Sequence, residues 1–279
     1  MSCDAYFKLM RFDKPIGILL LLWPTMWALW TAAPGIPSLK NIFIFSIGVI
    51  LMRAAGCVIN DIADRHVDSQ VVRTKMRPIT SGIIPVKNAV ILFSLLCVLA
   101  FVLVLFTNAL TILLSVCALC VAILYPFAKR YTYWPQTVLG LAFSFSIPMA
   151  FAAETNNIPP IAYVMMLANI AWTIAYDTEY AMTDRADDIR AGIKSTAILF
   201  AQHDRQMIGL FQVLALLILF LLGWIKQFSL AYFIALLIAG LFFVYQQILI
   251  AKREAENCFR AFLNNQWVGL VIFIGVLFR

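Results

Sequence analysis

Long apolar runs separated by shorter polar segments alternate along almost the whole chain. Nine of them are predicted to form helices, at residues 16–33, 42–59, 88–106, 109–125, 135–153, 159–176, 207–225, 230–250 and 265–278. A helix needs about 20 apolar residues to cross the hydrocarbon core of a bilayer, and most of these runs approach that length. The last run is short enough to be tilted or partly interfacial. The pattern predicts an all-α, polytopic membrane protein, a bundle of nine transmembrane helices.

Composition supports a membrane location and limits the number of domains. Of the 279 residues, 63% are hydrophobic, compared with about 45–50% in ordinary soluble domains. The mean hydropathy is +0.91. Nine spans would use most of the chain, so we expect one integral membrane domain over residues 1–279, with short loops and no separate soluble domain.

The net charge of +7 is explained by the sidedness of the predicted loops. On one side of the membrane the loops keep only Lys40, Lys226 and Arg279, whereas the loops on the other side carry nearly all remaining lysines and arginines. The positive-inside rule then places the N-terminus and the basic loops in the cytoplasm. Because this asymmetry accounts for the basic character, nucleic-acid binding is not expected.

A polar stretch at residues 60–78 follows the second apolar run directly. Its oxygen-bearing side chains are Asn60, Asp61, Asp64 and Asp68, and its basic side chains are Arg73, Lys75 and Arg77. Acids three or four residues apart fall on one helical face, which is typical of a divalent metal site. The basic residues that follow can bind phosphate.

A second stretch, residues 177–194, has the same character. It contains Asp177, Glu179, Asp184, Asp187, Asp188, Arg190 and Lys194. Asp184 and Asp188 would lie one turn apart if the stretch is helical, with Asp187 pointing partly away. Mg²⁺ takes one or two protein carboxylates plus substrate phosphates. Two separate acidic stretches therefore predict two ions flanking one diphosphate, and the alternative is a pair of solvated loops.

Arg53 lies inside the second apolar run, where an arginine costs at least about 2.5 kcal/mol. With Asn60 and Asp64 it shares one helical face. It is either a snorkelling or bundle-bridging cation or the receptor for an anionic group, a carboxylate, of a buried substrate.

Three further cations lie near predicted helix ends: Arg11, Lys129 and Arg130. We expect Arg11 to reach the diphosphate. Lys129 and Arg130 could either close over phosphate or anchor a helix end among lipid headgroups.

A weak internal repeat follows from the helix order. The two acidic stretches follow the second and sixth predicted helices, so four helices separate them. This predicts two four-helix halves, helices 1–4 and 5–8, related by an axis along the membrane normal, with a ninth helix outside the repeat.

Several segments match one known family. The motif NDxxDxxxD at residues 60–68 and VxRTxxRPxxSG at 71–82 resemble the first aspartate-rich motif of the UbiA superfamily of intramembrane aromatic prenyltransferases. YDTEYAMTDRADDIRAGIKST at 176–196 resembles the second, and LYPFAKRYTYWPQ at 124–136 and MRFDKPIG at 10–17 are similar too. The form is close to that of the 4-hydroxybenzoate polyprenyltransferases of ubiquinone biosynthesis.

The resemblance implies a nine-helix bundle in a bacterial or mitochondrial inner membrane, with Mg²⁺ as cofactor. It implies transfer of a polyprenyl group from polyprenyl diphosphate to the carbon ortho to the hydroxyl of 4-hydroxybenzoate. The residues carried over are Asp64 and Asp68 for one Mg²⁺, Asp184 and Asp188 for the other, Arg73, Arg77 and Lys194 for diphosphate, Arg130 for activity, and Asn60 and Arg53 for the acceptor.

Two other classes of function compete with this one. A related prenyltransferase could use dihydroxynaphthoate, homogentisate or haem as its acceptor. An ion-coupled transporter would also combine apolar helices with acids, but carriers tend to place those acids near the membrane midplane. Here nearly all acids lie at one predicted surface beside basic residues, which favours the enzyme.

Overall fold

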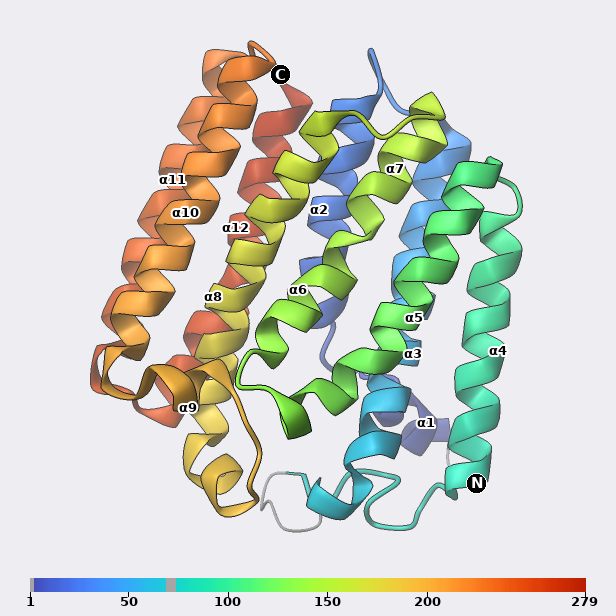
Figure 1. The fold of residues 1–279 in the computed structure, drawn as a ribbon, viewed down its shortest axis with the longest axis vertical. Coiled ribbons are helices and arrows are strands. Elements are labelled where there is room, and N and C mark those ends of the chain that lie inside the picture. Colours follow the sequence, from blue (N-terminus) through green and yellow to red (C-terminus); the bar gives the residue numbers. More distant parts are fainter. Residues whose placement is uncertain (1–2, 69–73) are drawn as a thin grey trace.

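The computed structural model describes residues 3–68 and 74–279, and every regular element in those ranges is helical. Most of the helices run side by side along the long axis of the molecule (Figure 1). The α-helices are α1 (Cys3–Leu9), α2 (Ile16–Ala32), α3 (Leu39–Asp68), α4 (Val86–Val104), α5 (Ala109–Tyr131), α6 (Pro135–Ser144), α7 (Ser146–Thr155), α8 (Pro160–Arg190), α9 (Thr196–Phe200), α10 (Asp204–Ile225), α11 (Leu230–Leu249) and α12 (Ala255–Leu277). The short 3₁₀ turns are η1 (Ala201–His203) and η2 (Ile250–Lys252).

The all-α membrane fold predicted from the sequence is confirmed. Each of the nine predicted runs overlaps a helix. In the described part of the chain, 7 helical segments are long and apolar enough to cross a membrane, with α6–α7 and α9–α10 each counted as one. Helix α2 is apolar but shorter, at 17 residues, and α8 carries its apolar part before the acids.

The two acidic stretches are extensions of helices, not the loops that the hydropathy pattern predicts. Helix α3 continues past the second apolar run to Asp68, and α8 continues past the sixth to Arg190. Helix α12 begins at Ala255, ten residues before the predicted run. Hydropathy indicates where the chain leaves the hydrocarbon core of the membrane, whereas a helix ends where its backbone hydrogen bonds end. Alanine, arginine and methionine, which follow the apolar runs here, have high helix propensity and extend the helices.

The fifth predicted run is divided into two helices at Phe145. Pro148 explains the break, because proline has no N–H to donate to the carbonyl four residues earlier, that of Ser144. Phe145 itself keeps right-handed helical angles (φ −61°, ψ −26°), so α7 follows α6 directly, and both border the cavity described below.

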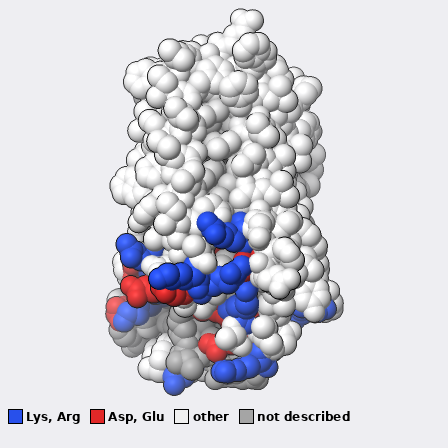
Figure 2. Space-filling model, turned by 90° about the vertical axis from the view of Figure 1, so that its left-hand side faces the viewer, with Lys and Arg blue, Asp and Glu red and all other residues white. Residues whose placement is uncertain are grey.

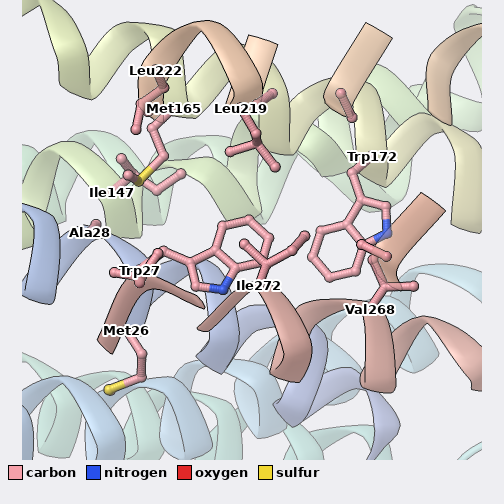
Figure 3. Packing of buried hydrophobic residues seen from close by; sticks show 14 of the residues in the cluster. Met26, Trp27, Ala28, Ile147, Met165, Trp172, Leu219, Leu222, Val268 and Ile272 are labelled. Carbon is pink, nitrogen blue, oxygen red and sulfur yellow. The ribbon is translucent and has the colours of Figure 1, made fainter. Parts of the chain in front are cut away.

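Two stacked tryptophans join the helices at the centre of the bundle. The rings of Trp27 in α2 and Trp172 in α8 lie 5.4 Å apart (Figure 3). The indole N–H of Trp27 donates to the carbonyl of Gly269 at 3.0 Å, and that of Trp172 donates to Asn265 Oδ1 at 2.8 Å. Both acceptors belong to α12, so α2, α8 and α12 are held in one arrangement.

Charged side chains gather at one end of the molecule, and the other end of the same face is almost free of them (Figure 2). The C-terminal ends of α3 and α8 lie at the same end of the bundle as α1 (Figure 1). The fold therefore brings the two acidic stretches to the same end, as the membrane topology predicts.

Candidate active site at the charged end of the bundle

Asp61 of α3 is buried, with 2% of its surface exposed, between two arginines. Its Oδ1 lies 2.9 Å from Arg77 Nη1 and 3.6 Å from Arg11 Nη2. Arg11 has a left-handed backbone (φ 60°), uncommon for a residue with a side chain, in the link between α1 and α2. Three separate segments therefore meet at one carboxylate.

Asp64, one turn further along α3, is 1% exposed and forms an ion pair with Lys129 of α5. The neighbouring Arg130 donates from Nη2 to the carbonyl of Ala63 at 2.5 Å. The backbone N–H of Lys194, in the link from α8 to α9, donates to the carbonyl of Lys129 at 3.0 Å. Helices α3 and α5 and the end of the second acidic stretch are joined at this point.

Three acids of the second acidic stretch lie on one face of α8. Asp184 and Asp188 are half-buried and one turn apart. Asp187 instead pairs with the exposed Arg190, at 3.7 Å. Asp177 lies two turns before Asp184 and so belongs to the same face.

Asp177 and Tyr125 connect the two acidic stretches. Asp177 interacts electrostatically with Arg53 and Lys129, and it forms a hydrogen bond with Gln136 of α6. The phenol of Tyr125 lies within electrostatic range of both Asp64 and Asp177. The arrangement places acids from α3 and α8 around the same small region.

An apolar cavity of about 170 Å³ adjoins this region. It is lined by side chains of α2, α3, α4, α5, α6 and α7, with Arg53 and Tyr125 among them. A cavity of about 150 Å³ accommodates a benzene ring, so this one has room for an aromatic acceptor.

Arg53 is the cation of the cavity. Its guanidinium lies over the ring of Phe143, 5.8 Å from the centroid, and its Nε is buried without a hydrogen-bond partner. Asp177 is within electrostatic range, but no described carboxylate forms an ion pair with Arg53. The predicted alternative of a bundle salt bridge is not observed in the described part of the chain, and the cation faces an apolar space.

The UbiA prenyltransferase family model matches residues 21–273. The chain belongs to the UbiA prenyltransferase family. A 4-hydroxybenzoate octaprenyltransferase of Yersinia pseudotuberculosis serotype IB (strain PB1/+) is 57% identical over 274 residues, which cover 98% of this chain and 95% of the relative.

Solved structures of UbiA homologues have the same fold. The apo structure of a UbiA homologue from Aeropyrum pernix K1 superposes with a TM-score of 0.82 at 20% identity, covering 93% of this chain and 96% of that one. A UbiA homologue from Archaeoglobus fulgidus bound to GPP and Mg²⁺ gives a TM-score of 0.73 at 16% identity, covering 98% of this chain and 99% of that one.

The donor set of this UbiA family member suits a divalent metal. Among the described residues, no group of three or more acidic, histidine or cysteine side chains forms a closed metal cage. Mg²⁺ does not need such a cage, because it binds through one or two carboxylates while substrate phosphates and water supply the rest. The paired carboxylates at one turn of α8 and the buried ones on α3 fit that requirement.

Other predicted site residues lie close by or outside the described residues. Asn60 is half-buried on the same face of α3 as Arg53, and Lys75 is exposed. The amine of Lys194 donates to the carbonyl of Tyr131 at 3.3 Å. Arg73 and the side chain of Asp68 lie outside the described part of the structure.

One buried cluster was not predicted from the sequence. Asp204, at the start of α10, is fully buried and forms ion pairs with Arg185 of α8 and with Arg253, whose Nη2 lies 2.8 Å from Oδ1. It ties the acidic end of α8 to α10 and to the turn before α12. No local spacing indicates it, since Arg253 is 49 residues away in the chain.

Proposed function

We propose that this chain transfers a polyprenyl group from polyprenyl diphosphate to the ring carbon ortho to the hydroxyl of 4-hydroxybenzoate. The product is 3-polyprenyl-4-hydroxybenzoate, a step of ubiquinone biosynthesis. The observation that carries the proposal is Arg53, a cation without an ion pair in the described structure, in an apolar cavity of aromatic size beside two sets of acids. The 57% identity to a 4-hydroxybenzoate octaprenyltransferase supports the same acceptor.

The charged end binds the diphosphate. The carboxylates that would hold two Mg²⁺ ions are those of the two acidic stretches, namely Asp61, Asp64 and Asp68 on α3 and Asp184 and Asp188 on α8. Bound Mg²⁺ supplies Lewis-acid stabilisation of the departing diphosphate. The cations that bind the remaining phosphate oxygens are Arg11, Arg73, Lys75, Arg77, Lys129 and Lys194, with Arg130 supporting catalysis next to them.

The apolar cavity binds the acceptor, and the isoprenoid chain leaves it sideways between the helices. Its lining on α3 extends from Gly56 to Ile44, twelve residues or about 18 Å of helix. Arg53 and Asn60 hold the acceptor at the charged end, where Arg53 binds its carboxylate. The allylic C–O bond then breaks with its electrons on the diphosphate, and the ring carbon attacks the allylic carbon. The ring loses its proton to a neighbouring carboxylate or to the released diphosphate.

The chain forms one integral membrane domain in the bacterial inner membrane, or in the mitochondrial one, with the N-terminus and the charged end in the cytoplasm or matrix. The charge asymmetry of the loops supports this orientation. The four-helix repeat, with α12 outside it, explains why the two acidic stretches approach each other from opposite halves of the chain.

Membranes that contain the full-length chain test the proposal. With 4-hydroxybenzoate, labelled polyprenyl diphosphate and Mg²⁺, we expect a labelled 3-polyprenyl-4-hydroxybenzoate, and none after addition of EDTA. Dihydroxynaphthoate and homogentisate serve as alternative acceptors in parallel reactions. Absence of any prenylated aromatic product with all acceptors would refute the proposal.

A further inference from the structure

Gly17, in the first turn of α2, lies against the guanidinium of Arg53. A Cβ added at Gly17 would be 2.1 Å from Nε, 2.4 Å from Nη2 and 2.6 Å from Cζ of Arg53. Such distances are far inside van der Waals contact, so no side chain fits at this position while Arg53 keeps its place. The α2 backbone here is helical, and the requirement for glycine is therefore one of space, not of conformation.

The three distances show which part of the guanidinium faces α2. Both nitrogens are nearer to the added Cβ than the carbon that joins them. The approach is therefore toward the Nε–Nη2 edge of the planar group and not onto its face. This explains why Nε is buried without a hydrogen-bond partner, because its N–H points at the carbon of a glycine.

A guanidinium can bind a carboxylate through either of two edges, the side edge Nε–Nη2 or the end edge Nη1–Nη2. Here Gly17 occupies the space at the side edge, and the ring of Phe143 lies 5.8 Å from Cζ. The end edge remains for an anion in the cavity.

We propose that Gly17 is a positioning residue for the acceptor. Because glycine has no side chain, the side edge of the Arg53 guanidinium can pack against α2. The end edge then faces the carboxylate of the aromatic acceptor. This inference rests on the role of Arg53 in the proposed function. It assigns a role in acceptor specificity to a residue of the segment MRFDKPIG, which contains none of the residues proposed to bind the acceptor.

The glycines that line the cavity make no such contact. A Cβ added at Gly48 or Gly56 meets nothing within 4 Å. At Gly17 the obstructing atoms are the end of a flexible side chain, so alanine displaces the guanidinium and leaves the backbone in place. Alanine is also the better helix former, and the substitution is therefore expected to change acceptor binding without loss of stability.

The test compares Gly17→Ala with two other glycine substitutions in the full-length protein. Steady-state rates are measured with 4-hydroxybenzoate varied at saturating polyprenyl diphosphate, and with the donor varied at saturating acceptor. We expect the acceptor KM of Gly17→Ala to rise about tenfold, since charge-assisted hydrogen bonds depend steeply on geometry. The donor KM and the melting temperature should stay at the wild-type values.

Two controls separate this effect from general packing. At Gly240 of α11 an added Cβ makes an ordinary contact, 3.6 Å from Leu216 Cδ1, so Gly240→Ala should behave as wild type. At Gly275 of α12 it would lie 2.6 Å from Ala235 Cβ. Gly275→Ala should lower the melting temperature without a selective change in the acceptor KM.

A double-mutant cycle with Arg53→Ala completes the test. If Gly17 acts through Arg53, Gly17→Ala should have no further effect once the guanidinium is gone. Where turnover is too slow, binding of radiolabelled 4-hydroxybenzoate gives the same comparison. A full additional penalty in the Arg53→Ala background, or a loss of stability like that of Gly275→Ala, would overturn the inference.

The outcome distinguishes this inference from the proposed function. Prenyl transfer that is weakened by Arg53→Ala but unaffected by Gly17→Ala refutes the role of Gly17 alone. Absence of prenyl transfer in the wild-type protein refutes both.

Discussion

Replacing Arg53 by methionine should make the protein more stable and less able to bind its acceptor. An arginine inside a membrane span costs at least about 2.5 kcal/mol. The contact with the Phe143 ring and the longer-range attraction to Asp177 offset roughly 1–2 kcal/mol of that cost. Methionine fills similar space without charge, so Arg53→Met should gain about 1 kcal/mol, or about 2–4 °C in melting temperature.

The same change removes the group that binds the acceptor carboxylate. Hydrogen bonds to a charged partner contribute about 1.5–3 kcal/mol, which corresponds to a rise of about 10- to 150-fold in the KM for 4-hydroxybenzoate. The donor KM should not change, because the diphosphate binds to other cations of the charged end and not to Arg53. Thermal unfolding in detergent and steady-state kinetics with each substrate varied measure both effects.

Arg65→Met is a suitable control for Arg53→Met. Arg65 is on the same helix, and its guanidinium donates to the carbonyl of Ile62 at 2.9 Å. This substitution should bring neither the gain in stability nor the selective rise in acceptor KM. If Arg53→Met lowers the melting temperature and leaves the acceptor KM unchanged, then Arg53 is a structural cation and its role as carboxylate receptor is wrong.

Three other results are expected. Asp64→Asn and Asp184→Asn should each lower turnover at least about 100-fold, with membrane insertion intact by fractionation; near-normal activity of either variant would contradict metal binding by both acidic stretches. Lys129→Met should raise the KM for polyprenyl diphosphate about tenfold and leave that for the acceptor alone, and the reverse selectivity would argue against a phosphate-binding role. Asp204→Asn should destabilise the protein by roughly 2 kcal/mol, because the buried carboxylate loses the charge that pairs with the partly exposed Arg185 and Arg253; an unchanged melting temperature would show that these ion pairs do not stabilise the fold.

The sequence by itself was enough to predict the fold class, the approximate spans and the acids on α3 and α8. Apolar runs of membrane length have few structural solutions in lipid, and the spacing of Asp61 and Asp64 places them near one helical face because helical periodicity is local. Where the helices end was less predictable. Polar residues that follow a membrane span can either extend its helix or end it, depending on contacts that hydropathy does not describe. In α3 and α8 they extend it.

Contacts between distant segments were decided only by the tertiary structure. The sequence identifies Arg53 as unusual, but the absence of an ion-pairing partner among the described residues depends on how several helices pack around a cavity. Gly17 contacts Arg53 across 36 positions of sequence, and Asp204 joins arginines of two other segments. No spacing rule relates such residues, because they come together only when whole helices pack. That packing depends on how the shapes and volumes of many side chains fit in the folded bundle.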